Sequence, residues 1–363
     1  MSNELKNDIR FIAVGAAGAN VVKMLERKDY KSYYINLAKQ DLDLIDSPNK
    51  LHISNGEGAS KDRNKAKAVL AESVDDVMNT LDNQITEQYI FVVYSLAGGT
   101  GSGLGTFLAS VIAENPNKKV GLVIILPSMN ESLQARINTY EALSEIIEIK
   151  NELCSIFILD NNQREDKFSI NRSFANLFEA YINVANNTSI RGVIDIAEQK
   201  KLLETPGIAM IHKATGTKED LLSTINEGIY VSLEPNKRVK YIGLSQPDTK
   251  DTMDVYQLKN FLDETIRDEN KYCCISARIT DLFGFDLKIT NATRIYVNTL
   301  NEDAWKLHIS NDLVSYEVPV IDDSINEFYV KDNAKSNSKT IIVKPFNQPF
   351  MEINLLFLKK HSN

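Results

Sequence analysis

Cysteine is scarce in this chain: 363 residues include only three, at positions 154, 273 and 274. Neither their number nor their spacing suits a disulfide framework or a zinc site, which need several ligands at short, regular intervals. Cys273 and Cys274 are adjacent inside an apolar, strand-like run, which favours buried thiols. A reducing environment, the cytoplasm, is therefore expected.

The chain also has a deficit of positive charge and lacks long apolar runs. Lysine and arginine number 41 against 49 aspartates and glutamates, giving a formal net charge of -8. Nonspecific nucleic-acid binding needs clustered cations, so no direct contact with nucleic acid is expected. No apolar run reaches the ~18 residues of a membrane span, and residues 1–10 lack the apolar core of a signal peptide. No membrane association is expected either.

What the chain does have is a glycine-rich stretch, Ala97-Gly98-Gly99-Thr100-Gly101-Ser102-Gly103. It follows an apolar run at 89–94, typical of a buried parallel strand, and precedes a helix of small and apolar residues at 104–113. In such a unit glycines let the backbone approach a ligand, and loop N–H groups and the positive helix end attract phosphate. A ligand-free turn is the alternative, but this density of glycine and hydroxyl groups favours a phosphate site.

A second loop of small residues, Gly15-Ala16-Ala17-Gly18-Ala19-Asn20, follows a strand predicted at 9–14. It matches a dinucleotide-binding fingerprint only in part, since the middle glycine is replaced and Asn20 stands where Gly or Ala is usual. The alternative is a turn that packs a helix closely against a strand.

Strands and helices alternate along the first 160 residues. Further strands are predicted at 32–36, 51–53, 121–126 and 154–159, and helices at 21–27, 62–81 and 137–149. This alternation indicates an α/β fold, a parallel sheet with helices on both faces and ligands at the carboxyl ends of the strands. Both small-residue loops lie at those ends.

We expect residues 1–170 to form a nucleotide-binding domain, and a long central helix at 171–190 to join it to a second α/β domain with a mixed sheet at 191–300. Residues 301–363 are strand-rich, and the sequence assigns them no role. Beyond the central helix, strands are predicted at 207–211, 239–244, 272–279, 294–300, 316–320, 340–343 and 353–358, and helices at 218–233 and 256–268.

The order of these loops resembles the tubulin/FtsZ superfamily, including its plasmid- and phage-borne TubZ-like members. The stretch 97–103 resembles the family's phosphate loop, 15–20 and 36–40 its first and second nucleotide loops, 56–59 the loop that senses the γ-phosphate, and 127–131 the ribose loop. The resemblance implies GTP or GDP as ligand, with Mg²⁺. It assigns to the nucleotide Gly15, Ala16, Ala17, Asn20, Asn36, Gly58, Ala59, Ala97, Gly98, Gly99, Thr100, Gly101, Ser102, Glu131, Arg136, Asn161, Phe168, Asn171 and Asn176.

Some of these residues would recognise the base. Asn161 matches the asparagine that reads the guanine edge, and Phe168 could stack on the base. A second reader belongs near the start of the central helix, where Asn171 and Asn176 both fall. A helix cap or turn role is the alternative for each asparagine. Arg136 lies one position later than the family's arginine.

Counting back from Gly207, whose surroundings resemble the family's second domain, places the catalytic loop at 192–198. Asp195 and Glu198 then fall on its two acidic positions. Two acidic residues three positions apart at the start of a helix can point in the same direction. The alternative is that they only complement the helix dipole. In this family the pair enters the nucleotide pocket of the next subunit, so the resemblance implies a GTPase that is activated by head-to-tail polymerisation with its own copies.

The resemblance favours a filament for plasmid or phage DNA segregation. A DNA-bound adaptor protein would then grip the C-terminal region, where 359–361 is basic; a solvated terminus is the alternative. Other possibilities are an FtsZ-like cell-division protein and a GTP-binding structural relative with little hydrolysis, since Ala38 and Val193 depart from the family pattern. A nicotinamide-dependent oxidoreductase would need an acidic residue at the end of the second strand, where Asn36 stands.

Overall fold

The computed structural model describes residues 4–53, 58–128, 131–186, 194–214, 228–231, 239–243 and 245, together with the backbone of seven short strands between 277 and 342. Within these residues, no helix has the length and apolar character needed to cross a membrane.

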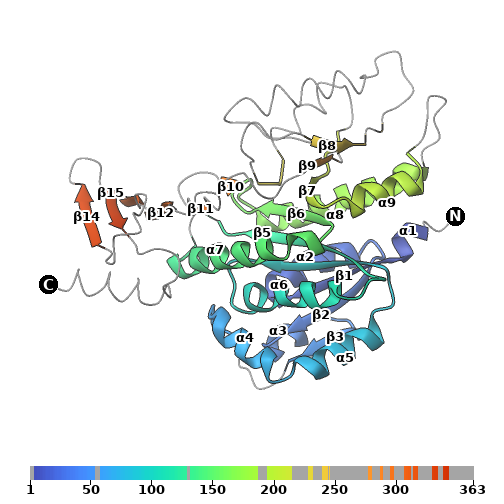
Figure 1. Cartoon of the computed structure of the whole chain (residues 1–363), viewed down its shortest axis with the longest axis horizontal. Helices are drawn as coiled ribbons and strands as arrows, with labels where there is room; N and C mark the ends of the chain where they lie inside the picture. Colours follow the sequence, from blue (N-terminus) through green and yellow to red (C-terminus); the bar gives the residue numbers. More distant parts are fainter. Residues whose placement is uncertain are drawn as a thin grey trace, which may run out of the picture.

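A nine-stranded sheet forms the centre of the molecule, in the order β3-β2-β1-β4-β5-β6-β7-β9-β8 (Figure 1). Its strands are β1 (Ile9–Val14), β2 (Lys31–Asn36), β3 (Lys50–His52), β4 (Tyr89–Ser95), β5 (Lys119–Leu126), β6 (Ser155–Asp160), β7 (Gly207–Met210), β8 (Val239–Ile242) and β9 (Ala277–Ile279). The first seven in this order are parallel, whereas β9 is antiparallel to both β7 and β8. The predicted parallel sheet of an α/β fold is confirmed.

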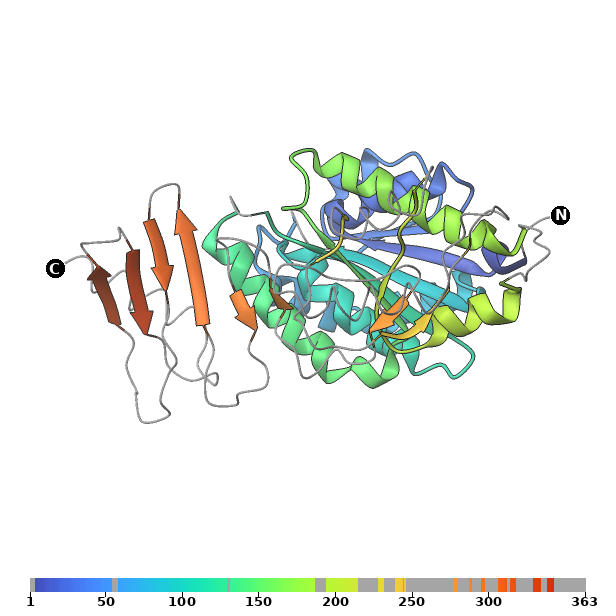
Figure 2. The same ribbon diagram turned by 90° about the horizontal axis from the view of Figure 1, so that it is seen from above.

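Helices cover both faces of the sheet. They are α1 (Glu4–Asn7), α2 (Gly15–Glu26), α3 (Lys39–Asp43), α4 (Arg63–Ala71), α5 (Val74–Gln84), α6 (Thr100–Ala113), α7 (Leu133–Glu148), α8 (Lys167–Ile182) and α9 (Ile196–Glu204), with short 3-10 turns η1 (Lys150–Glu152) and η2 (Asn183–Asn186). α2 and α8 pack side by side on one face, and α4, α6 and α7 pack together on the other (Figures 1 and 2).

Aromatic side chains fill the space between the sheet and these helices. On one face the ring of Phe178 in α8 lies 5.2 Å from Phe11 of β1 and 5.6 Å from Phe91 of β4. On the other face Tyr94 of β4 lies under α6, and a Cβ on Gly105 would come within 2.4 Å of its ring. All these rings are fully buried, as expected of parallel strands covered on both sides.

The helices that follow the two glycine loops begin earlier than predicted. α2 starts at Gly15 and α6 at Thr100, so much of each loop is the first turn of a helix. Close packing explains this: a Cβ on Gly18 would lie 2.1 Å from the carbonyl oxygen of Val93, and one on Gly103 would lie 2.7 Å from that of Arg63. The packing role left open for the first loop is therefore real for Gly18.

Two other helices also differ from prediction. The helix predicted at 62–81 is split into α4 and α5, because Ser73 leaves the helical conformation at φ -135°. Asp75 and Asp76 in the first turn of α5 are the start signal that the continuous apolar periodicity obscured. The central helix, α8, begins four residues earlier than predicted, after Asp166 caps the backbone N–H of Phe168 at 2.9 Å.

A second sheet has six strands in the order β10-β11-β12-β13-β15-β14. These are β10 (Leu287–Lys288), β11 (Ile295–Val297), β12 (Lys306–Asn311), β13 (Val314–Glu317), β14 (Tyr329–Asn333) and β15 (Ser338–Ile342). Tyr230 forms a β-bridge with Leu159 and residues 228–231 are not helical, so the helix predicted at 218–233 does not include them. The remainder of that helix, the helix at 256–268 and the strand at 353–358 lie outside the described residues.

An ion cluster around the buried Glu87 ties the starts of β1, β2 and β4 together. Arg10 Nε donates to Glu87 Oε2 at 2.6 Å, and Lys31 Nζ lies 2.8 Å from Oε1. Burial alone would raise the pKa of Glu87, but the hydrogen bonds from Arg10 and Lys31 outweigh it and lower this pKa from 4.5 to about 2. The charged form therefore stabilises the fold above about pH 4.5, and this stability is lost as pH falls towards 2.

We expect Glu87→Gln to lower the free energy of unfolding at pH 7 by on the order of 2 kcal/mol, because it leaves Arg10 without its anion. At pH 3 the difference from wild type should shrink. Urea unfolding at both pH values measures this, with Glu72→Gln, an exposed glutamate after α4, as control. A difference that is equal at pH 3 and pH 7 would contradict the assignment.

Candidate functional site

Six loops meet at the carboxyl edge of the sheet. They follow β1 to β6, and each leads into a helix. Parallel strands place their carboxyl ends at the same edge, so these loops are neighbours although they are far apart in the sequence. Ligands of open α/β sheets bind at this edge, where the predicted nucleotide loops are found.

Two helix N-termini touch at this edge. A Cβ on Gly15, which has a φ of +76°, would lie 3.2 Å from the amide nitrogen of Gly101, so the first turns of α2 and α6 are in contact. Among the described residues no side chain caps either helix; the cap positions are Val14 and Gly99. Both first turns thus present N–H groups, and two positive helix ends converge. This arrangement suits a phosphate group.

The loop between β4 and α6 is packed on one side and open on the other. A Cβ on Gly99 would come within 2.7 Å of the Ala59 Cβ, and the Ser102 hydroxyl donates to the carbonyl oxygen of Gly98. A Cβ on Gly98, by contrast, meets no heavy atom of the described residues within 4 Å. A ligand can therefore approach the backbone at Gly98.

The loop between β3 and α4 lies against this phosphate loop. Ala59 packs on Gly99, and a Cβ on Gly58, at φ +94°, would lie 3.5 Å from the Ala38 Cβ of the second loop. Ser60 and Lys61 both have left-handed backbones, with φ of 47° and 63°. Such residues are strained and persist only where their surroundings hold them. The loop between β3 and α4 thus lies against both the second loop and the phosphate loop.

The side chain of Asn36, at the end of β2, forms hydrogen bonds within its own loop. Its Oδ1 accepts from the backbone N–H of Ala38 at 3.2 Å, and its Nδ2 donates to Asp41 Oδ2 at 3.0 Å. This is a turn-forming role, and it fixes the loop whose Ala38 contacts Gly58.

The loops predicted for ribose and base also lie together. Lys167, the first residue of α8, makes a 3.1 Å ion pair with Glu131 ahead of α7. Phe168 is 58% exposed, as a residue that stacks on a ligand would be before binding. Of the two candidates further along α8, Asn171 is buried and Asn176 is exposed.

Arg136 and Asn161 have different surroundings. Arg136 is buried within α7; burial lowers the pKa of its guanidinium, and the nearby charge of Glu131 opposes that shift. Asn161 is half-buried directly after β6. Its neighbour Asn162 donates to the carbonyl oxygen of Pro127 at 3.1 Å, which holds the loops after β5 and β6 side by side.

Asp195 and Glu198 lie at the opposite edge of the sheet. They form a capping box at the start of α9: Asp195 accepts from the N–H of Glu198 at 2.8 Å, and Glu198 accepts from that of Asp195 at 3.1 Å. The next residue, Gln199, donates from Nε2 to the carbonyl oxygens of Tyr181 and Ile182, at 2.7 and 3.2 Å, so the start of α9 lies at the end of α8. α8 crosses between the two edges, and its 16 residues span about 24 Å. The exposed acids therefore face away from their own phosphate loop.

Two buried polar residues beside the loops were not identified from the sequence. Asn138 of α7 donates to the carbonyl oxygen of Lys61 at 2.8 Å, and Arg63 of α4 donates to that of Ser102 at 3.0 Å. Asn138 lies within the helix predicted at 137–149, but its loop partners are 40 or more positions away, so no local pattern marks it.

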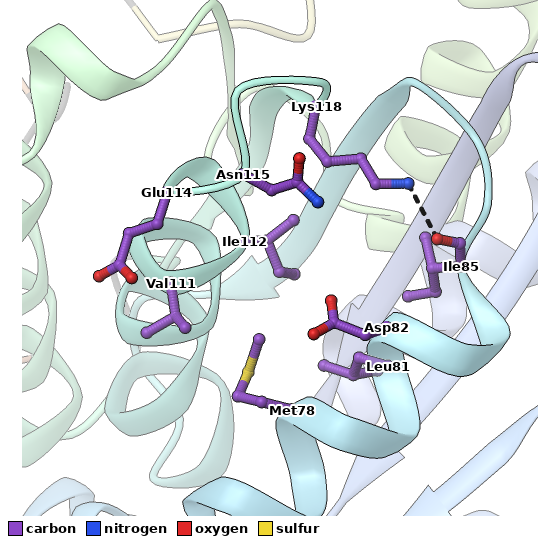
Figure 3. A pocket seen from close by; sticks show the side chains of 9 residues that line it. All are labelled: Met78, Leu81, Asp82, Ile85, Val111, Ile112, Glu114, Asn115 and Lys118. Carbon is purple, nitrogen blue, oxygen red and sulfur yellow. Dashed lines mark hydrogen bonds between the residues drawn. The ribbon is translucent and has the colours of Figure 1, made fainter.

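A cavity of about 390 Å³ lies apart from these loops, between α5, the end of α6 and the segments that lead into β4 and β5 (Figure 3). Its lining residues are Met78, Leu81, Asp82, Ile85, Val111, Ile112, Glu114, Asn115 and Lys118. The Lys118 ammonium donates to the carbonyl oxygens of Ile85 and Glu87, at 2.9 and 2.7 Å. With its only lysine engaged and two carboxylates in its lining, this cavity does not suit phosphate.

Comparisons with known proteins agree with this geometry. The model of the Tubulin/FtsZ family GTPase domain matches residues 8–167. The tubulin-like protein TubZ of Clostridium botulinum C phage is 27% identical over 367 residues, 96% of this chain and 100% of that protein. The crystal structure of Clostridium botulinum phage c-st TubZ has a TM-score of 0.59 at 26% identity, over 74% of this chain and 86% of that chain. A GTPγS-form protofilament of Bacillus thuringiensis serovar israelensis TubZ, 18% identical, shares the fold with a TM-score of 0.57, over 64% and 72% of the two chains.

Gly98 and Gly99 form a matched pair for testing the loop. We expect Gly98→Ala to keep the thermal unfolding midpoint, because its Cβ has room, and to weaken GTP binding about tenfold or more by blocking close approach of a phosphate. Gly99→Ala should lower the midpoint, because its Cβ collides with the β3–α4 loop. Calorimetry and equilibrium dialysis measure the two effects. Wild-type GTP affinity in Gly98→Ala would show that phosphate does not bind at this open side.

Proposed function

The chain belongs to the tubulin/FtsZ family through the GTPase domain at residues 8–167, and we propose that it polymerises head-to-tail and hydrolyses GTP between subunits. One observation carries this proposal: the phosphate loop lies at the carboxyl edge of the sheet, whereas the acidic pair Asp195 and Glu198 lies beside the end of α8, at the opposite edge. A nucleotide at one subunit's loop would meet the acids of the next molecule. A contact of this heterologous kind does not close on itself, so it builds a filament.

The nucleotide would lie along the carboxyl edge. The first turns of α2 and α6, with Gly98, would hold the phosphates, and Glu131 would accept from the ribose hydroxyls. Asn161 and Asn171 would read the base with Phe168 stacked on it, because Asn171 is on the packed side of α8 whereas Asn176 faces solvent. Mg²⁺ would neutralise charge on the phosphates, to which it commonly binds with few protein ligands. The described residues contain no group of three His, Cys, Asp or Glu side chains placed to hold a metal.

The acidic pair is well built for its proposed role. Its reciprocal hydrogen bonds fix the spacing of the two carboxylates, and both side chains are exposed. Each carboxylate has a second oxygen with which to orient and polarise a water molecule for attack on the γ-phosphate, while loop N–H groups stabilise the developing charge. The helix cap and the catalytic role are therefore compatible.

We place the filament in plasmid or phage DNA segregation in the cytoplasm. Support comes from the full-length similarity to TubZ of a Clostridium botulinum phage. A DNA-bound adaptor protein would be the partner at the C-terminal region, whose basic residues 359–361 lie outside the described residues. The alternatives are a role in cell division and a GTP-binding relative with little turnover. A measured GTP turnover would exclude the second alternative.

Phosphate release per subunit should rise steeply with protein concentration, together with GTP-dependent sedimentation, because each active site needs two molecules. Malachite-green assays and pelleting across a range of concentrations test this. Turnover per subunit that is constant with concentration would exclude catalysis between subunits.

Asp195→Asn and Glu198→Gln each keep a residue type that caps a helix but remove the charge. We expect both variants to bind GTP and assemble, and to lose turnover about 100-fold or more. The matched control is Asp75→Asn, which removes an exposed carboxylate from the first turn of another helix, α5, away from the nucleotide loops. Unchanged turnover in both acidic variants would mean that the catalytic loop is elsewhere.

Asn171→Ala and Asn176→Ala distinguish the two base-reading candidates. Loss of Asn171 should reduce the preference for GTP over ATP about tenfold, because one hydrogen-bonding group facing the base is removed. Asn176→Ala should leave it unchanged. The reverse result in competition binding would transfer the role to Asn176.

A further inference from the structure

One face of α7 ties three elements of the carboxyl edge together. Asn138, Glu141 and Glu145 recur at helical spacing on that face, which packs against α4 and α6 (Figures 1 and 2). None of the three belongs to the predicted nucleotide contacts, yet each binds a group within or next to a nucleotide loop.

The side-chain amide of Asn138 joins two loops. It is fully buried, and its Nδ2 lies 2.8 Å from the carbonyl oxygen of Lys61, 3.1 Å from that of Ala97 and 3.4 Å from that of Gly98. Carbonyl oxygens only accept, so the amide nitrogen is the atom that faces them. Gln134 Nε2 donates to Asn138 Oδ1 at 3.0 Å and holds the amide in this orientation.

This contact orients the phosphate loop. A peptide unit is planar and trans, so its N–H points away from its C=O. With the carbonyls of Ala97 and Gly98 turned towards Asn138, the N–H groups of Gly98 and Gly99 point the other way. The open space at Gly98 shows that a ligand has room beside this part of the loop.

Arg63, the first residue of α4, makes a second connection to α7. It is buried, and it donates to Glu141 at 2.8 Å, to Glu145 at 2.7 Å and to the carbonyl oxygen of Ser102 at 3.0 Å. Lys67 also pairs with Glu145. The first turn of α4 is therefore fixed to the first turn of α6, and the left-handed residues Ser60 and Lys61 are held from both sides.

The position of the held loop indicates which phosphate it meets. Along the edge the strands run β3-β2-β1-β4-β5-β6, and the proposed base-binding residues follow β6. The phosphates then extend towards the loop after β3, so that loop lies beside the terminal phosphate. We infer that Asn138 is a positioning residue that, by holding this loop on the phosphate loop, sets the preference for a nucleoside triphosphate over a diphosphate; this rests on the proposed nucleotide site.

The test is the ratio of GDP to GTPγS dissociation constants, measured by equilibrium dialysis of the full chain below its assembly concentration. Asn138→Asp keeps the shape but puts a carboxylate against three carbonyl oxygens, so the ratio should fall about fivefold or more. Gln134→Ala, at an exposed position, should lower it less. If Asn138→Asp does not fold, the ratio measured for Gln134→Ala tests the role of Asn138 in its place.

Thr139→Val is the matched control. It removes a buried hydrogen bond of 2.8 Å to the Ala135 carbonyl oxygen, within the same helix and with no link to a loop, so the ratio should not change. Equal weakening of both nucleotides by Asn138→Asp, the same ratio change in Thr139→Val, or a wild-type protein without preference would each overturn the inference. A wild-type protein that binds neither nucleotide would instead refute the nucleotide site itself.

Discussion

The close approach of α2 and α6 is the constraint on which the carboxyl edge depends. At Gly15 and Gly101 backbone packs on backbone, and a Cβ on Gly101 would come within 3.0 Å of the Ser95 carbonyl oxygen and 3.2 Å of that of Val14. A side chain at either glycine would push the helices apart, and their positive ends would no longer converge. Glycine is thus required first for packing, and the anion site is a consequence of that packing.

The same sheet that creates the phosphate site also keeps the acidic pair away from it. α8 runs along one face from the carboxyl edge to the amino edge, where its last turns are anchored by the 3.0 Å ion pair between Glu179 and Lys6. Phe178 locks the helix onto β1 and β4, so the distance between the two half-sites is set by a rigid core. A chain built in this way can complete the proposed active site only by meeting a second copy.

Local sequence patterns predicted the parallel sheet and the phosphate loop, because each depends on neighbouring residues. They failed where distant contacts decide. The early starts of α2 and α6 follow from contacts of Gly18 with Val93 and of Gly103 with Arg63, which no local pattern contains. Asn138 was missed for the same reason: its partners are 40 and more positions away.

The different burial of Asn171 and Asn176 was within reach of the sequence. Phe174 and Phe178 are three and seven positions after Asn171, so these three residues share a helix face, and the aromatic rings predict that this face is packed. Asn176 falls outside that spacing. The structure agrees, with Asn171 buried and Asn176 exposed.

α7 carries contacts to both ends of the proposed nucleotide. On the ribose side, Ser132 caps the first turn of α7 directly after Glu131. On the phosphate side, Asn138 binds the Lys61 carbonyl oxygen and Glu141 binds Arg63, and these contacts hold the loops. A helix is stiff over this distance, so the ribose loop and the strained loop at 60–61 cannot shift independently. The left-handed residues Ser60 and Lys61 persist only where their surroundings hold them, and the buried amide of Asn138 holds the Lys61 carbonyl oxygen. In the inferred mechanism, this one hydrogen-bonded side chain keeps the loop beside the terminal phosphate and so distinguishes three phosphates from two.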